Sequence, residues 1–409
     1  MIKVFLQFSA SEKHFVGKLL VHKKSILFEY AKAFLNTGLE LSPFNLPLIA
    51  KVHSANNSPF NGLHGVFADS LPDGWGLLLM DRFLRQQGIN VRQLSPLDRL
   101  SFIGHTGMGA LVYEPDYAVE SSNQMLDLSE LAKESHLIYQ GKQQEVLPEI
   151  IRAGGSPAGA RPKVLVAIKG EHLISGEAQI PEGYEGWLIK FHAEQQQEGI
   201  IEEVYARMAR AAGLNMPETR LFEADFARYF AVKRFDRVDG ERLHVHSLAG
   251  LVNADFRMPD FDYEVFFKVV ALLTKQPQDC ERAFRQMVFN VLSANRDDHS
   301  KNFSFVMDRM GDWRLSPVYD LTFNYGFSGE HSMAIAGYGK DVPIKVFFEL
   351  GAVIGLEAVA VRSIFAEVFE ALSLWGSLTL ELGLDKVHAD EIQVVFDGLF
   401  DCYKGILSA

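Results

Sequence analysis

The sequence is poor in cysteine: only Cys280 and Cys402 occur among its 409 residues. Two isolated cysteines cannot supply the disulfide framework that stabilises many small secreted domains. Unpaired thiols are typical of proteins that work in a reducing compartment. We therefore expect both thiols to be reduced and the protein to be cytoplasmic.

Long apolar runs are also missing. The longest, such as Val265–Leu273 and Val346–Gly355, contain Lys or Glu and are shorter than the roughly 20 residues that a membrane-spanning helix needs. The segment Met1–Ala10 alternates like a strand and lacks the apolar core and cleavage site of a signal peptide. The sequence therefore predicts a protein without membrane contact.

Basic residues are in the minority, with 40 Lys and Arg against 52 Asp and Glu and a net charge of −12. Binding the phosphates of a nucleic acid takes an excess of Lys and Arg. Apart from any local basic patch, the chain by itself is not expected to hold DNA. What the sequence does contain is apolar side chains: 48% of its residues are hydrophobic, enough for well-filled cores in two or three domains.

Two glycine-rich segments do not match the common nucleotide-binding patterns. Gly104–Gly109 has the order G-x-x-G-x-G and no βαβ context, so it is interpreted as a turn and not as a dinucleotide site. In Gly154–Lys163, Ala160 stands where a Walker A loop needs its lysine. The glycines of this second loop would let backbone N–H groups approach phosphates. Taken alone, the loop is equally well an ordinary hairpin connection.

The most informative segment is Asn295-Arg296-Asp297-Asp298-His299-Ser300-Lys301-Asn302. An Asp followed five residues later by an Asn is the spacing of a phosphoryl-transfer loop, in which the Asp accepts the hydroxyl proton and the Asn binds magnesium. Polar clusters of this kind also occur where a helix simply ends in a solvated turn. The flanks favour the catalytic interpretation, because a buried helix precedes the loop and charge without a purpose is costly there. That helix is indicated by the apolar spacing of Phe284, Met287, Val288, Val291 and Leu292.

A predicted hairpin after this loop supplies a second metal ligand. Strands are expected at Phe303–Asp308 and Trp313–Leu315, with a turn between them. An antiparallel hairpin brings its two ends together, so Asn302 before it and Asp320 after it are expected to converge on one ion. Mg²⁺ takes few oxygen ligands from protein and uses phosphate and water for the rest. An amide and a carboxylate would therefore suffice.

Upstream, Lys190 lies in the otherwise apolar strand Gly186–Phe191. It either extends to solvent from the strand end or is the ATP-anchoring lysine of a kinase small lobe, which pairs with a glutamate on a helix. The catalytic loop downstream favours the second interpretation. The predicted helix Ile201–Ala212 carries Glu202 and Glu203 in its first turn. The spacing does not choose between them, and Glu202 is assigned here.

The order of these elements predicts an α+β, bilobal protein-kinase-like fold with its chemistry in the cleft between the lobes. The expected organisation is an N-terminal subdomain at residues 1–115, a linker with one helix at 116–147, a small lobe with the Gly-rich loop at 148–240, and a helical large lobe at 241–409. The other expected elements are strands at Val4–Phe8, Val16–Leu20, Ile26–Tyr30, Ala110–Tyr113 and Val164–Ile168, a hairpin of Thr219–Glu223 and Arg228–Arg234, and a helix at Gly74–Gln87 opened by Asp73.

Several segments together resemble one known family, the HipA-like serine/threonine kinases, which are the toxin halves of bacterial toxin–antitoxin pairs. Gly62–Trp75 resembles that family's F-x-G-L-L-P-E-G-W segment, and Phe230–Arg237 resembles its V-x-R-F-D-R strand end. Asn295–Phe303 and Leu315–Asp320 are similar to its catalytic and metal-binding segments. The resemblance covers almost the whole chain, and the motifs are specific in combination.

The resemblance implies a role for each matching residue. Asp297 would be the catalytic base, Asn302 and Asp320 would bind Mg²⁺, and Lys190 would hold the ATP phosphates. Gly155, Ser156 and Lys163 would belong to the nucleotide-binding loop, and Ser156 falls where the family has a serine that is autophosphorylated. A phosphate there would add negative charge to a loop that must approach ATP. The alternative, a plain loop serine, stays open.

Two segments depart from the family pattern. After His244-Val245-His246 the chain reads Ser-Leu-Ala-Gly where the family often has an acidic E-D-F segment. His246 is therefore either a contact to the nucleotide at the hinge or a structural histidine. The loop has Ala160-Arg161-Pro162-Lys163 where Ala-Gln-Glu-Lys is common. Both departures concern adenine contacts and loop regulation and leave the catalytic core unchanged.

The sequence thus predicts a serine/threonine protein kinase that uses ATP and Mg²⁺ and is controlled by autophosphorylation. By resemblance, its partners would be a protein substrate, for example an aminoacyl-tRNA synthetase, and a HipB-like DNA-binding antitoxin through which it would reach DNA. One alternative is a small-molecule phosphotransferase of the aminoglycoside type, against which the N-terminal subdomain and Ser156 count. Another is a catalytically silent kinase fold that docks the antitoxin, against which the intact Lys190, Asp297, Asn302 and Asp320 count.

Overall fold

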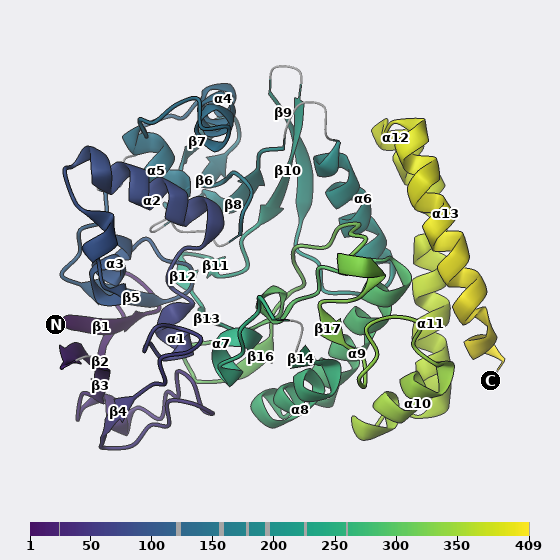
Figure 1. Cartoon of the computed structure of the whole chain (residues 1–409), viewed down its shortest axis with the longest axis horizontal. Helices are drawn as coiled ribbons and strands as arrows, with labels where there is room; N and C mark the ends of the chain where they lie inside the picture. Colours follow the sequence, from purple (N-terminus) through teal and green to yellow (C-terminus); the bar gives the residue numbers. More distant parts are fainter. Residues whose placement is uncertain are drawn as a thin grey trace. The chain divides into compact units, whose positions relative to one another are not determined.

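A computed structural model describes the chain except for residues 24, 120–123, 155–158, 177–179, 193–196, 225–226, 259–260 and 409. The chain divides into two compact units (Figure 1), which we call the first and the second unit. The first unit consists of Met1–Glu194, Phe222–Asn253 and Val306–Asp312, and the second of Gln195–Leu221, Ala254–Phe305 and Trp313–Ala409. Strands dominate the first unit and helices the second, so the predicted α+β class is confirmed. The four ranges predicted from the sequence do not map one to one onto the units and stay a prediction.

The first unit begins with an antiparallel sheet of five strands in the order β4-β3-β2-β1-β5. Alternation places Val4 and Leu6 in the core, where both side chains are fully buried. The four strands predicted in this region exist, with ends that differ by up to three residues. The strands are β1 (Ile2–Gln7), β2 (Lys13–His22), β3 (Ser25–Tyr30), β4 (Val52–Ser54) and β5 (Leu111–Glu114).

A second five-stranded sheet has the order β7-β6-β8-β10-β9. Strand β6 pairs antiparallel with β8, and β8 pairs antiparallel with β10. The strand predicted at Val164–Ile168, the strand with Lys190 and the hairpin that follows are confirmed. The strands are β6 (Lys163–Lys169), β7 (His172–Ser175), β8 (Glu185–Lys190), β9 (Thr219–Ala224) and β10 (Ala227–Lys233).

The first unit also contains six helices and three short strands among its described residues. Helix α3 begins with a capping box, in which the Ser95 hydroxyl accepts from the Asp98 N–H at 3.2 Å and Asp98 accepts from the Ser95 N–H at 2.8 Å. The helices are α1 (Gly65–Ala68), α2 (Gly74–Gln86), α3 (Pro96–Ile103), α4 (Leu128–Tyr139), α5 (Pro148–Gly154) and α7 (Leu248–Val252), with 3₁₀ turns at Phe34–Asn36 and Val91–Gln93. The short strands are β11 (Arg237–Val238), β12 (Glu241–Arg242) and β13 (His244–Ser247).

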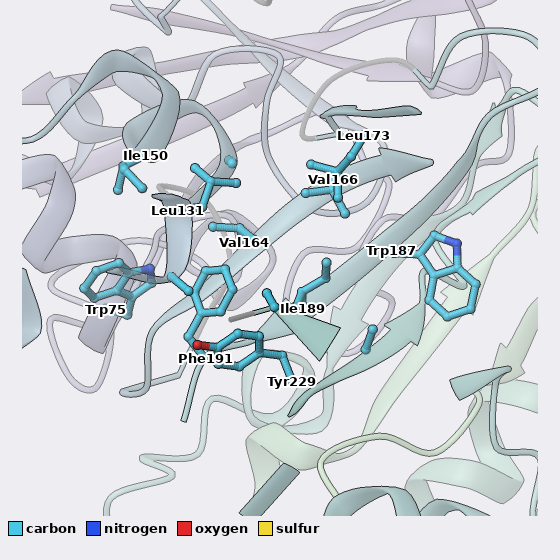
Figure 2. Packing of buried hydrophobic residues seen from close by; sticks show 14 of the residues in the cluster. Trp75, Leu131, Ile150, Val164, Val166, Leu173, Trp187, Ile189, Phe191 and Tyr229 are labelled. Atoms are coloured by element: carbon cyan, nitrogen blue, oxygen red, sulfur yellow. The ribbon is translucent and has the colours of Figure 1, made fainter. Parts of the chain in front are cut away.

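One core cluster joins the second sheet to three helices (Figure 2). Trp75 of α2 and Trp187 of β8 lie at opposite ends of the cluster in this view, and both are fully buried. Burying an aromatic side chain contributes a large apolar area. The cluster therefore fixes α2, α4 and α5 against the sheet. Between the tryptophans it contains Leu131, Ile150, Val164, Val166, Leu173, Ile189, Phe191 and Tyr229.

The second unit is mainly helical. The long helix before the predicted catalytic loop is α9, and every apolar residue that predicted it is buried. None of the described helices is long and apolar enough to cross a membrane. The helices are α6 (Glu198–Ala211), α8 (Tyr263–Thr274), α9 (Pro277–Leu292), α10 (Ile344–Val353), α11 (Ala358–Leu372), α12 (Trp375–Leu382) and α13 (Lys386–Tyr403), with 3₁₀ turns at Ser300–Asn302, Phe327–Gly329 and Lys404–Leu407.

Four short strands complete the structure. The pair β14 (Phe261–Asp262) and β17 (Met333–Ala334) is parallel. The strands β15 (Ser304–Met307) and β16 (Trp313–Leu315) occupy the two arms of the predicted hairpin. The Ser316 N–H donates to the Ser304 carbonyl at 3.0 Å and closes the open end of that hairpin.

Helix α6 corrects one detail of the sequence-based prediction. It begins at Glu198, three residues before the predicted start, so Glu202 and Glu203 lie in its second turn and not in its first. The prediction missed the start because Gly199 weakens a helix by about 1 kcal/mol. Burial of Ile200 and Ile201, each 4% exposed, outweighs that cost.

Candidate active site

The predicted catalytic loop leaves α9 through a sharp turn. Ala294 has a left-handed backbone (φ 51°), and the Asn295 N–H donates back to the Asn290 carbonyl at 3.0 Å. The Asn295 side-chain amide also donates to Asn290 Oδ1 at 2.9 Å. The end of the helix and the start of the loop are therefore fixed by two hydrogen bonds between the same two residues.

Asp298 holds the loop in place through buried hydrogen bonds. It is 1% exposed, and its carboxylate accepts from the Tyr263 hydroxyl at 2.7 Å, from His331 Nδ1 at 2.9 Å and from the Ser332 N–H at 2.8 Å. Burial, with the charge of Asp298, raises the pKa of Tyr263 well above its ordinary value, so this hydroxyl stays a donor. Asn290 extends the network by donating to the Tyr263 oxygen at 3.0 Å.

Asp297, the predicted base, has the opposite environment. Its side chain is 52% exposed, although the residues on both sides of it are held by the protein. The Asn302 side-chain amide donates to the Asp297 carbonyl at 2.7 Å. This bond ties together the two ends of the D-x-x-x-x-N motif. It also leaves Asn302 Oδ1, the oxygen that a metal would need, as the remaining polar atom of that side chain.

The predicted metal residue Asp320 is drawn towards the same loop. Its neighbour Tyr319 donates to the Lys301 carbonyl at 2.8 Å and lies 2.6 Å from the Ser304 hydroxyl. Because Lys301 immediately precedes Asn302, this hydrogen bond links the segment that carries Asp320 to the segment that carries Asn302. Asp320 has φ 57°, a left-handed conformation that Asp tolerates better than most residues and that concentrates at functional sites.

The donors suit Mg²⁺ better than a transition metal. Among the described residues, no three His, Cys, Asp or Glu side chains are gathered as a metal site. The amide oxygen of Asn302 and the carboxylate of Asp320 are hard oxygen donors, and two such ligands are what Mg²⁺ takes when phosphates and waters complete its shell. The residues present therefore fit a nucleotide-bound magnesium ion.

In the first unit, the two predicted phosphate-binding lysines are direct neighbours. Lys163 of β6 pairs in register with Lys190 of β8, and each residue is 7% exposed. Residues directly opposite one another in antiparallel strands have side chains on the same face, and like charges there repel. Lys190 Nζ also lies 5.7 Å from the centroid of the Phe230 ring. Two buried lysines on one sheet face are a candidate site for a polyanion such as a triphosphate.

The two glutamates of α6 differ in their partners. Glu203 Oε1 accepts from Arg207 Nε at 2.8 Å, one turn further along the same helix. Glu202 is 4% exposed and does not take part in that pair. The pair with Arg207 distinguishes the two glutamates, and the assignment of Glu202 as the helix carboxylate stays a prediction.

His246 has both ring nitrogens engaged inside the first unit. Nδ1 lies 2.6 Å from Asp69 Oδ2, and Nε2 lies 3.0 Å from the Ser42 hydroxyl. Asp69 also accepts from the N–H and the hydroxyl of Ser247, both at 2.7 Å. No ring nitrogen remains for a nucleotide, so the geometry supports the structural alternative for His246. The predicted loop residues Gly155 and Ser156 lie outside the described residues.

Sequence reasoning missed the anchoring residues Asp298, Tyr263 and His331. One local signal was available: adjacent side chains in an extended loop point to opposite sides, so one of Asp297 and Asp298 had to turn inward. The partners could not be found this way, because Tyr263 lies on α8 and His331 near β17, both far from the loop in sequence.

Comparison with known proteins identifies two family models along the chain. The HipA N-terminal domain model matches residues 10–114, and the HipA-like C-terminal domain model matches residues 155–375. The second match alone spans more than half of the chain.

Two curated relatives differ in how much of them the chain spans. The serine/threonine-protein kinase toxin HipA of Shewanella oneidensis is 26% identical over 320 residues, which is 71% of this chain and 68% of that protein. The Sinorhizobium fredii protein Y4dM is 30% identical over 166 residues, so that match covers 36% of this chain and 40% of that protein.

A solved structure of the toxin–antitoxin system of Shewanella oneidensis, with HipA, HipB and operator DNA, has the same fold. Its TM-score is 0.72 at 18% identity, and the match covers 100% of this chain and 98% of that chain. The predicted kinase-like α+β fold is confirmed by this likeness. Because the C-terminal model spans more than half of the sequence and the N-terminal model precedes it, the chain belongs to the HipA-like family.

Proposed function

We propose that this chain is a serine/threonine protein kinase that uses ATP and Mg²⁺. The observation that carries the proposal is the contrast within the catalytic loop. Asp297 presents a carboxylate that is 52% exposed, while Asp298 next to it is buried under three hydrogen bonds and Asn302 is tied to the Asp297 carbonyl. A loop held this firmly can keep one carboxylate in position for a substrate hydroxyl without further reorganisation.

Each residue has a role in this mechanism. Asp297 accepts the proton of a serine or threonine hydroxyl, whose oxygen forms the new bond to phosphorus while the bond to ADP breaks. Lys163 and Lys190 bind the phosphates, and Glu202 is assigned as the helix carboxylate. Asn302 and Asp320 would hold Mg²⁺, which when bound neutralises charge on the phosphates. Positioning and charge neutralisation supply most of the rate in such sites.

The relatives suggest the partners. The solved structure with the same fold contains HipB and operator DNA. We propose a DNA-binding antitoxin as the partner of this chain, because a net charge of −12 does not favour direct DNA binding. The substrate is proposed to be a protein, with an aminoacyl-tRNA synthetase as one candidate, and autophosphorylation at Ser156 is proposed as the control. A cytoplasmic location stays a prediction.

The test compares the wild type with Asp297→Asn after incubation with Mg-ATP. Intact-mass and phosphopeptide analysis should find phosphate in the wild type, and the variant should lose about 10²- to 10⁴-fold in rate because the base is gone. ATP affinity should be unchanged. Asp401→Asn is the matched control, since it removes a carboxylate whose side chain is 70% exposed on α13.

Two results would contradict the proposal. Equal phosphate incorporation in the wild type and in Asp297→Asn would remove Asp297 from the chemistry. A wild type that neither incorporates phosphate nor binds ATP would favour the catalytically silent fold that only docks a partner.

A further inference from the structure

The start of α2 is hydrogen-bonded to residues 159–163, the segment that leads into β6. The Gly159 N–H donates to Asp73 Oδ1, and the Gly159 carbonyl accepts from the Trp75 N–H at 2.9 Å. Both backbone groups of Gly159 are therefore satisfied by two residues that are far away in sequence. Asp73 is the N-cap residue of α2, but its side chain makes no capping bond to the helix and turns to the loop instead.

Gly74 lets the two segments touch. A Cβ atom built on Gly74 would lie 2.6 Å from Ala160 Cα and 2.6 Å from the Gly159 oxygen. Contacts this short to backbone atoms do not occur, and Gly74 also has φ 42°, which side chains disfavour. The close approach of α2 and the loop therefore requires glycine at this position.

Trp75 fixes the other end of the loop. Its indole Nε1 donates to the Lys163 carbonyl at 3.0 Å. The ring is fully buried and belongs to the same core cluster as Val164 and Phe191 (Figure 2). A buried indole that has lost its partner leaves a donor unsatisfied, so this bond holds the start of β6 in one place.

The loop in turn positions the ammonium group of Lys163. A Cβ on Gly159 would lie only 2.3 Å from Lys163 Nζ, so the ammonium group rests against the bare backbone of this glycine. The contacts form an unbroken series from Asp73, Gly74 and Trp75 through Gly159 to Lys163. Lys163 is in turn the register partner of Lys190.

We infer that Asp73, Gly74 and Trp75, here called the α2 clamp, are positioning residues for the phosphate-binding lysines. The clamp holds Gly159–Lys163 in the conformation that presents Lys163 beside Lys190 on one sheet face. A loop that samples other conformations would bind a triphosphate more weakly in proportion to the lost population. The inference rests on the proposed kinase function for its ligand, but the clamp itself can be measured without ATP.

The first experiment is hydrogen exchange of the full chain without nucleotide. Asp73→Ala should expose the Gly159 N–H and raise the exchange rate of peptides covering 159–166 at least tenfold, whereas Asp73→Asn keeps an acceptor oxygen and should restore most of the protection. The matched control is Asp127→Ala, because Asp127 accepts from the Glu130 N–H at 3.1 Å at the start of α4 and makes an ordinary helix cap. Unchanged exchange in Asp73→Ala would overturn the clamp.

The second experiment measures Mg-ATP affinity and turnover. Trp75→Phe keeps the aromatic packing and removes the indole donor, so it should raise Kd and KM for Mg-ATP about five- to tenfold. The kcat at saturating ATP should stay within about twofold of the wild type, because bound nucleotide selects the competent loop. Gly74→Ala should have a larger effect in the same direction.

The outcomes separate the two proposals. A wild type that does not bind ATP overturns the proposed function, while the exchange experiment still decides the clamp. A wild type that binds ATP, with unchanged KM in Trp75→Phe and in Gly74→Ala, overturns the positioning role alone. A fall in kcat and thermal stability without a change in KM would also overturn it, because that result is what general damage to the core predicts.

Discussion

At the scale of single residues, the proposed catalytic loop contains two adjacent aspartates in opposite environments. Asp297 is half exposed, and Asp298 is 1% exposed and accepts three hydrogen bonds. The sequence predicted the first role from the spacing to Asn302. It could not predict the second, because the donors come from distant parts of the chain. Spacing therefore indicates a candidate base such as Asp297 more easily than the groups that hold its loop.

The buried carboxylate gives a prediction about stability. Asp298→Asn should lower the free energy of unfolding by about 3 kcal/mol. The NH₂ group of the new amide replaces one acceptor oxygen, so at least one buried N–H or O–H that donates to Asp298 loses its acceptor. The loop should also lose its position, and kcat should fall. Chemical denaturation and turnover of the same preparation measure both effects.

Asp297→Asn is the internal control for this prediction, since an exposed side chain contributes little to folding. It should lose turnover and keep the stability of the wild type. If Asp298→Asn kept both the stability and the kcat of the wild type, the anchoring role of the network would be wrong.

At the scale of elements, the strand end that follows β10 joins the two sheets of the first unit. Asp236 is fully buried and accepts from Arg234 at 2.9 and 2.8 Å and from Arg237 at 2.8 Å. Arg237 also donates to the carbonyls of Gly109 and Gly107 at 2.8 and 3.0 Å, in the glycine cluster that the sequence analysis interpreted as a turn. The Arg-Phe-Asp-Arg motif that carried part of the family resemblance therefore has a structural role: its buried ion pairs connect the end of β10 to the glycine cluster before β5.

The buried Asp236 carboxylate predicts that the stability of the fold depends on pH. Burial alone would raise the pKa of Asp236, but the charges of Arg234 and Arg237 outweigh it and hold the pKa well below its ordinary value. A carboxyl group with a lowered pKa stabilises the fold fully above its unfolded pKa, and this stability is lost as the pH falls towards and through the folded pKa. Asp236→Asn should therefore destabilise the protein by roughly 3–5 kcal/mol at pH 7. The difference from the wild type should begin to shrink below about pH 4, the unfolded pKa of an Asp, and should keep shrinking as the pH falls towards the lowered folded pKa.

Denaturation midpoints at several pH values measure this effect. Asp308→Asn, at the exposed turn between β15 and β16, is a suitable comparison because it also removes one carboxylate. A difference between Asp236→Asn and the wild type that stays constant with pH would contradict the assignment of the effect to ionisation.

Helices and strands were predicted correctly where a local sequence pattern determines them. They were predicted less accurately where tertiary packing determines their ends or their pairing. The strands around Lys190 are short, mainly apolar runs, and the helix before Asp297 follows apolar spacing; all of them are present. The start of α6 was predicted too late because burial of Ile200 outweighs the weak helix propensity of Gly199. The register pair Lys163–Lys190 could not be predicted, because register depends on how β6 and β8 meet and not on either strand alone.

At the scale of the whole molecule, the boundaries of the compact units could not be predicted from the sequence, whereas net charge and apolar content could be read from it directly. Each compact unit is assembled from three separate stretches of sequence, and Val306–Asp312 at the tip of a hairpin belongs to a different unit from the rest of its surroundings in sequence. Sequence patterns define contiguous ranges, so units assembled from separate stretches could not be predicted from them. Net charge and apolar content do not depend on that order, and they are the basis for the last prediction.

With a net charge of −12, the isolated chain should not bind a fluorescent 30-base-pair duplex of random sequence in anisotropy measurements at about 0.15 M salt. The reason is that phosphate contacts need clustered Lys and Arg, and an acidic protein repels the duplex at long range. Adding the proposed DNA-binding partner and a duplex with that partner's operator should create binding, with a salt dependence set by the partner's basic residues. Tight binding by the chain alone that weakens steeply with salt would contradict this view. It would show that a local basic patch on this chain, and not its partner, contacts the DNA.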